Sequence, residues 1–202
     1  RQVTDFITTY GMKTLFLKPT EMVRGSKKAK ELEEDITSYL NVPISKANGH
    51  WPVPSNTARR ANGYTALAWK HVVVKAKTGV NLNKIADITD LTNAVEAAIL
   101  ALQAGKRQWS LSHIVRHYTD SGDHGGAIIT WLHEMGHQVQ FQAMRMDIPT
   151  PGLNESITTY SMQDTMEWHA EHFAAWALNR AMLETHYPAI VAYFDELMGE
   201  LL

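Results

Sequence analysis

The chain has 202 residues and a net charge of −2 at pH 7, with 45% hydrophobic and 20% charged residues, a composition typical of a globular protein and unlike a disordered one. It contains no cysteine, which excludes disulfides, thiolate zinc sites and thiol nucleophiles. No apolar run approaches the roughly 20 residues that span a bilayer, and no signal-peptide pattern is present, so we expect a soluble protein without a membrane partner. The sequence does not determine the compartment, and both a secreted, toxin-like protein and a cytoplasmic one fit it. The start at Arg1 allows for a piece of a longer polypeptide or assembly.

The charge is distributed unevenly along the chain. Residues 1–117 carry 17 Lys and Arg against 9 Asp and Glu, whereas residues 118–202 carry 2 against 12. An acidic half suits a cation or a basic substrate, and a basic half suits nucleic acid, although solvated faces of different composition explain the same pattern. No nucleic-acid-binding motif accompanies the basic half, so we expect no nucleic-acid partner.

Three segments of the first half have recognisable patterns. Residues 20–40 place apolar side chains three to four positions apart and predict a helix capped by Thr20. Residues 41–63 are rich in Pro, Gly and Asn and predict a long loop that borders a substrate cleft. Residues 64–77 contain a run of valines and predict a strand.

The next two segments predict a helix and a half-buried strand. Residues 87–104 have the spacing of an amphipathic helix that stops at Gly105. Residues 109–117 alternate between apolar or aromatic side chains and mostly polar ones, which is typical of a strand. The edge of such a strand can pair with an extended peptide. The residues that we expect to contact a substrate there are His113, Val115 and His117.

The last third predicts helices. Residues 119–126 form a turn-rich break in which Asp123 can cap the helix that follows, at residues 127–146. Two further helices are predicted near residues 163–184 and 188–199. The expected fold class is therefore α+β, with a small mixed sheet and an edge strand beside a central helix, followed by a helical part.

The central helix carries His133, Glu134 and His137 in the pattern H-E-x-x-H. Residues four apart lie on one face of a helix, so both imidazoles can bind one metal ion. Glu134 stands beside the first ligand and can take a proton from a water bound to that ion. A histidine-bound metal site with a carboxylate base is the chemistry that this spacing predicts.

A catalytic zinc site requires a third protein ligand. A third histidine six residues after His137 is missing, because that position holds Ala143. A glutamate from a later segment is the alternative, and the candidates are Glu155, Glu167 and Glu171. Glu155 lies in a turn, whereas Glu167 and Glu171 are four apart on a predicted helix. If Glu167 binds the metal, Glu171 can accept the second N–H of a ligand histidine.

The residues after the central helix resemble those of a known family. Thr158 and Tyr160 fit a Ser/Thr-x-Tyr motif, and Glu167, Glu171 and Phe173 follow in the pattern E-x-x-A-E-x-F, with Glu167 seven residues past the tyrosine. This order, after H-E-x-G-H, resembles the catalytic domain of anthrax lethal factor and related zincins of toxins and phage head proteins. The similarity covers roughly residues 125–178, although the link from His137 to the tyrosine motif is shorter than in lethal factor.

The resemblance implies a gluzincin site with zinc as cofactor. In it His133, His137 and Glu167 would be the zinc ligands and Glu134 the general base. Glu171 would support a ligand histidine, and Tyr160 would donate its hydroxyl proton to the oxyanion.

The sequence therefore predicts a single zincin-like domain over residues 1–202, with a helix and strand part at 1–118 and a metal-binding helical part at 119–202. We expect a zinc-dependent endopeptidase acting on a protein or peptide, with a preference for basic or apolar residues near the cut because the second half is acidic. Two alternatives are a catalytically silent structural or assembly component, for example of a phage particle, and a repressor-cleaving regulatory metallopeptidase.

Overall fold

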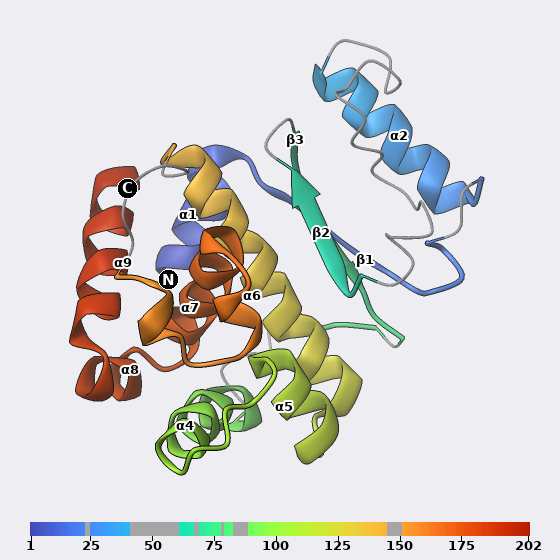
Figure 1. The fold of residues 1–202 in the computed structure, drawn as a ribbon. Coiled ribbons are helices and arrows are strands. Elements are labelled where there is room, and N and C mark those ends of the chain that lie inside the picture. Colours follow the sequence, from blue (N-terminus) through green and yellow to red (C-terminus); the bar gives the residue numbers. More distant parts are fainter. Residues whose placement is uncertain (23–24, 41–60, 67–68, 78, 83–88, 145–150) are drawn as a thin grey trace.

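A three-stranded mixed sheet lies between helix α2 (Lys27–Leu40) and the remaining helices (Figure 1). The computed structural model describes residues 1–22, 25–40, 61–66, 69–77, 79–82, 89–144 and 151–202. Of the loop predicted at 41–63, the part from residue 41 to residue 60 lies outside the described residues. Helices occupy most of the described chain and accompany this one small mixed sheet, so the predicted α+β class is confirmed. None of the described helices is long and apolar enough to cross a membrane.

The sheet has the order β1-β3-β2, with β1 parallel and β2 antiparallel to the central strand. The bounds are β1 Lys13–Leu17, β2 Gly63–Ala66 and β3 Trp69–Lys75. Side chains alternate between the faces of a strand. In β3, Val72 and Val74 accordingly join the main core, whereas Val73 packs on the side of α2.

The prediction of one strand over residues 64–77 was wrong, because this segment forms the antiparallel pair β2 and β3. Sequence reasoning missed the division because residues 64–70 contain no Gly, Pro or Asn, the residues that mark turns.

Helix α2 (Lys27–Leu40) confirms the second part of the helix predicted at 20–40, but it begins later. Its cap is Ser26, whose Oγ accepts the N–H of Ala29 at 3.1 Å, and not Thr20. Its buried residues pack with Leu17 and Val73 in a cluster on their own face of the sheet. Helix α1 (Gln2–Tyr10), which the sequence did not predict, lies on the opposite side with Phe6 in the main core.

The structure places a helix where the sequence predicted a strand. Helix α4 (Thr89–Gln103) confirms the helix predicted at 87–104, and Gly105 follows it with φ +76°. Residues 109–117, however, form α5 (Leu111–Tyr118). The Oγ of Ser110 accepts the N–H of His113 at 3.1 Å and caps this helix. Its buried residues have three-to-four spacing as well as the alternation that suggested a strand; they are Leu111, Ile114 and Val115.

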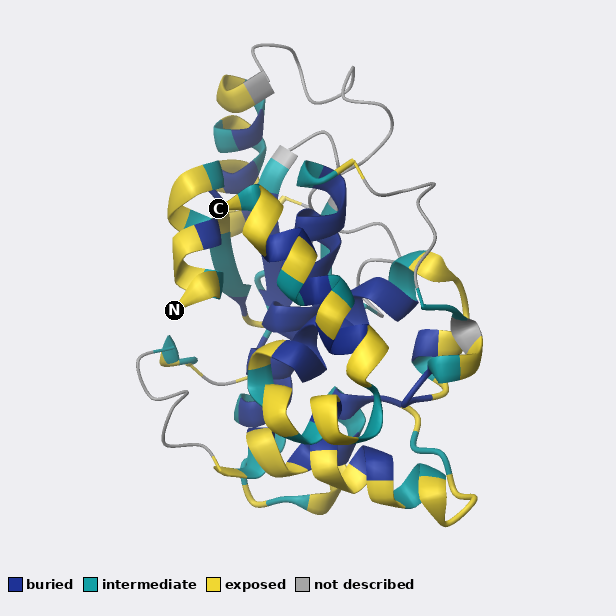
Figure 2. Ribbon diagram, turned by 90° about the vertical axis from the view of Figure 1, so that its left-hand side faces the viewer, coloured by how far each residue is buried: buried dark blue, intermediate teal, exposed yellow. Residues whose placement is uncertain are grey.

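Helix α6 (Gly122–Gln142) runs through the middle of the molecule and is buried continuously from Gly125 to Phe141. Figure 2 shows the buried residues gathered at the centre and the exposed ones on the outer helix faces. Asp123 lies inside the first turn of α6 and does not cap it, since the helix begins one residue earlier. The predicted end at Met146 was wrong, because α6 ends at Gln142 and Met144 has left the helical region with φ +54°.

The helix predicted near 163–184 is two helices, α7 (Thr165–Leu178) and α8 (Arg180–His186). Asn179, with φ −152° and ψ 69°, leaves the helical region, and its side chain accepts the N–H of Met182 to cap α8. The last helix, α9 (Pro188–Leu201), confirms the prediction at 188–199.

Candidate metal centre

Helices α6 and α7 approach each other closely at Gly136. A Cβ at this position would lie 2.8 Å from the Cα of Ala170 and 2.9 Å from the Cβ of Phe173, which is closer than such atoms can come. A ring N–H of His169 can bridge the same contact, because its Nδ1 is 3.0 Å from the carbonyl oxygen of Gly136. The glycine therefore brings the H-E-x-x-H face of α6 against the acidic face of α7.

Three predicted ligands meet at this crossing. The Nε2 of His133 lies 2.8 Å from one carboxylate oxygen of Glu167, and the Nε2 of His137 lies 3.5 Å from the other. One potential ligand atom from each residue falls within 4.8 Å of the other two. A group of this kind can hold a metal ion. Glu155, the alternative ligand, ends the short helix Leu153–Glu155 and is not part of the group.

Glu171 fixes the orientation of His133. The Nδ1 of His133 is 3.0 Å from Oε2 of Glu171, so this N–H donates to the carboxylate and Nε2 faces the other ligands. The second oxygen of Glu171 accepts the N–H of Leu111 at 2.7 Å and the hydroxyl of Thr158 at 3.3 Å. Helix α5 thus holds the carboxylate through its first backbone N–H, a contact that no local sequence pattern signals.

The carboxylates stabilise positive charge where the ligand atoms meet. Burial lowers the pKa of His133, but its hydrogen bonds to Glu167 and Glu171 outweigh burial and raise the pKa to about 10. Burial acts to raise the pKa of Glu167, but the hydrogen bonds from His133 and His137 hold it well below its usual range. A site that favours an imidazolium in this way also meets the electrostatic condition for a bound cation.

Glu134 is buried beside this group, on the side of α6 that faces strand β2. Burial raises the pKa of its carboxyl group, while the two neighbouring histidines oppose the rise. Strand β2 covers Glu134, because a Cβ on Gly63 would lie 3.1 Å from Cγ of Glu134 and 2.7 Å from Cγ2 of Thr130. Only glycine allows this approach, and the sequence analysis did not single out Gly63.

Tyr160 stacks on the ring of His133, with ring centroids 5.5 Å apart and an interplanar angle of 27°. Its position is fixed by its backbone N–H, which donates to the carbonyl of Trp109 at 2.8 Å. Burial and the nearby carboxylate of Glu167 raise the pKa of Tyr160. The hydroxyl group therefore stays protonated at neutral pH, and the side chain of Glu167 accepts its hydrogen bond.

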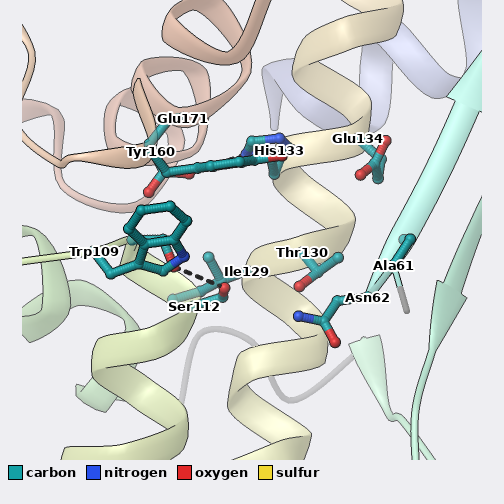
Figure 3. A pocket seen from close by; sticks show the side chains of 12 residues that line it. Ala61, Asn62, Trp109, Ser112, Ile129, Thr130, His133, Glu134, Tyr160 and Glu171 are labelled. Carbon is teal, nitrogen blue, oxygen red and sulfur yellow. Dashed lines mark hydrogen bonds and ion pairs between the residues drawn. The ribbon is translucent and has the colours of Figure 1, made fainter. Parts of the chain in front are cut away.

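A cavity of about 240 Å³ opens next to the His-His-Glu group. Figure 3 shows Trp109 beneath Tyr160, with Asn62 and Thr130 across from the indole ring and Ile129 between them. The Trp109 side chain is 48% exposed, and its ring centroid is 5.7 Å from that of Tyr160. Sequence reasoning had placed Trp109 on a strand and gave it no role, since its position depends on the pairing of segments far apart in the chain.

The predicted substrate-contacting residues His113, Val115 and His117 do not form a sheet edge. They lie on helix α5, where Val115 is buried and packs over Gly125, and where none of the three lines the cavity. The prediction of strand pairing at 109–117 was therefore wrong. Among the strands that the structure describes, the edge strand next to α6 is β2.

No protein-family model matches the chain, and no curated protein or solved structure matches it. The residues at the crossing of α6 and α7 form a His-His-Glu group that can hold a metal ion, with a buried carboxylate, a protonated phenol and a cavity beside it.

Proposed function

We propose that the chain is a zinc-dependent endopeptidase with a zincin-like arrangement of strand and helix. The observation that carries the proposal is the convergence of His133, His137 and Glu167 within 4.8 Å, directly beside the buried Glu134. A merely structural metal site has no use for a carboxyl group whose pKa is raised by burial, or for a phenol stacked on one of the ligands.

The set of donors favours zinc among the common metals. Two imidazoles and one carboxylate suit Zn²⁺, whereas Mg²⁺ and Ca²⁺ prefer oxygen ligands only. Three protein ligands leave one position for water, as in other catalytic zinc sites. A bound ion would supply Lewis acidity, lowering the pKa of that water and polarising the carbonyl of the substrate.

The residues of the chain would handle the protons and the developing charge. The carboxylate of Glu134 would accept a proton from the attacking water and pass it to the leaving amine. The hydroxyl of Tyr160 would donate a hydrogen bond to the oxyanion as the carbonyl carbon becomes tetrahedral. The carboxylate of Glu171 would hold His133 in the tautomer that presents Nε2 to the metal.

Strand β2 is the best candidate for binding an extended peptide. It is the edge strand of the described sheet, and its first residue, Gly63, packs directly on Thr130 and Glu134. A peptide added along this edge would pass over the H-E-x-x-H face of α6, and one of its side chains could enter the cavity beside Trp109. β2 takes the role that the sequence had assigned to residues 109–117.

Metal analysis combined with digestion of a peptide library tests the proposal. We expect about one zinc per chain in the wild type and in Glu134→Gln, and cleavage by the wild type only, because the variant loses the base and no ligand. Glu184→Gln, which alters an exposed carboxylate on α8, is the matched control and should cleave normally. A chain that binds no zinc would overturn the proposal. Zinc binding without cleavage of any library peptide would favour a structural or assembly role.

A further inference from the structure

A second pair of histidines lies four residues apart on a helix, away from the proposed catalytic site. His113 and His117 are on α5, and their ring centroids are 4.4 Å apart with an interplanar angle of 45°. The pair His133 and His137, at the same spacing on α6, has its centroids 5.0 Å apart. Because the segment is a helix, these side chains project from one face in consecutive turns, as two chelating imidazoles must.

Both rings are free to bind a ligand. His117 is exposed and His113 is half-buried, and neither imidazole has a hydrogen-bond partner in the described part of the chain. Tyr118 packs edge-on against His113 at 6.0 Å between centroids, which limits the motion of that ring. Arg116 is directed elsewhere, since its guanidinium donates to Thr130 on α6.

We propose that His113 and His117 form a second, surface metal site for a borderline divalent transition metal such as Ni²⁺, Cu²⁺ or Zn²⁺. Imidazole nitrogens bind these ions well and bind Mg²⁺ and Ca²⁺ poorly. Within the described residues no third histidine or carboxylate completes a group with them, so water fills the other positions and binding is weaker than at the three-ligand site. The site does not depend on the proposed peptidase activity.

Occupancy of this site would stabilise α5. The helix has 8 residues, and isolated helices of that length are marginal because nucleation is costly. A metal that joins His113 to His117 would hold consecutive turns together. The first residue of the same helix, Leu111, holds the carboxylate of Glu171 at 2.7 Å, so the bound metal would also steady the support of His133.

Calorimetric titration of zinc-loaded protein with Ni²⁺ tests the proposal, with the zinc content measured before and after. We expect one Ni²⁺ per chain to bind without release of zinc, and Ni²⁺ to raise the midpoint of thermal unfolding. The variants His113→Gln and His117→Gln should not bind this additional Ni²⁺, and Ni²⁺ should not raise their midpoint of thermal unfolding. His186→Gln, which removes a histidine at the end of α8, should keep both.

Two results would overturn the proposal. One is a wild type that takes up no Ni²⁺ beyond exchange with zinc, and the other is uptake that persists unchanged in both α5 variants. Because all readouts are metal binding and thermal unfolding, they stay informative whether or not the chain cleaves peptides.

Discussion

The Nδ1 of His133 and the Oε2 of Glu171 lie 3.0 Å apart in the buried contact between α6 and α7. This pair links the face of α6 that carries the candidate metal ligands to α5, because the other oxygen of Glu171 accepts the N–H of Leu111 at 2.7 Å. The orientation of one proposed ligand therefore depends on residues from three separate helices. The folding of α5 and the affinity for metal should be coupled through this carboxylate.

Glu171→Gln should weaken zinc binding by about 10- to 100-fold, the usual effect of losing a carboxylate that orients a ligand histidine. The amide oxygen can still accept the N–H of Leu111, but the amide nitrogen would then face the N–H of His133 as a second donor. Competition with a chromogenic chelator measures the affinity. The exposed Glu184→Gln serves as control. An unchanged affinity in Glu171→Gln would remove Glu171 from this role.

Tyr160→Phe should keep zinc and lower kcat by about 100- to 1,000-fold with little change in KM, because it removes one hydrogen-bond donor to the oxyanion. The ring stack on His133 does not need the hydroxyl, so the phenylalanine should keep the local packing. Steady-state kinetics on a peptide cleaved by the wild type separates the two parameters. A proportional rise in KM with constant kcat would point to ground-state binding instead.

The site was more predictable from the sequence than the fold around it. His133, Glu134 and His137 are fixed by local helical geometry, so their spacing alone indicates a shared face. The prediction of Glu167 as the third ligand depended on a family resemblance, because Glu167 meets the two histidines only where α7 packs against α6. Local spacing cannot predict a contact between two separate helices.

The errors have physical causes as well. In α5 the apolar residues fit both a two-residue and a three-to-four-residue repeat, and a nine-residue segment is too short to separate them. The cap by Ser110 is the local signal that could have favoured the helix. The backbone pairing of Trp109 with Tyr160 joins distant segments and leaves no such signal.

Gly136→Ala should destabilise the protein by about 1–3 kcal/mol and weaken metal binding, since the added methyl group forces α6 and α7 apart at Ala170. Gly199→Ala is the matched control. It lies in α9 with no atom near the position of the new methyl group, so alanine should be neutral or stabilising by up to about 1 kcal/mol. Urea unfolding of the metal-free proteins measures the change in the free energy of unfolding for each of the two variants. Equal stabilities of the two variants would contradict the close crossing.

His172 should make the protein sensitive to acid. Burial lowers its pKa to about 4, below the value of about 6.5 in the unfolded chain, although the hydrogen bond that its Nδ1–H donates to the carbonyl of Trp168 opposes this fall. Its Nε2 accepts the N–H of Ile157, as a neutral ring can. The unfolded state then binds more protons. The contribution is fully present above about pH 6.5 and is lost as the pH falls towards 4, by on the order of 3 kcal/mol.

His172→Gln provides the comparison for this pH dependence, because its amide oxygen can accept the N–H of Ile157 but does not titrate. Unfolding of metal-free protein between pH 7.5 and 4.5 should show a shallower loss of stability in the variant than in the wild type. Identical slopes would mean that His172 does not remain neutral in the folded protein.

Trp109→Ala should raise KM for peptides with a large apolar or aromatic residue next to the cleaved bond by roughly 5- to 30-fold, and should leave zinc binding unchanged. The indole ring forms one wall of the cavity and is 48% exposed, so a substrate side chain can bury it further, and burial of one aromatic contact contributes about 1–2 kcal/mol. Peptides with alanine at that position provide the matched comparison, since they cannot reach the ring and should be cleaved equally by both proteins. If the variant lost activity on all peptides alike, Trp109 would instead be acting through the position of Tyr160, whose backbone N–H it accepts.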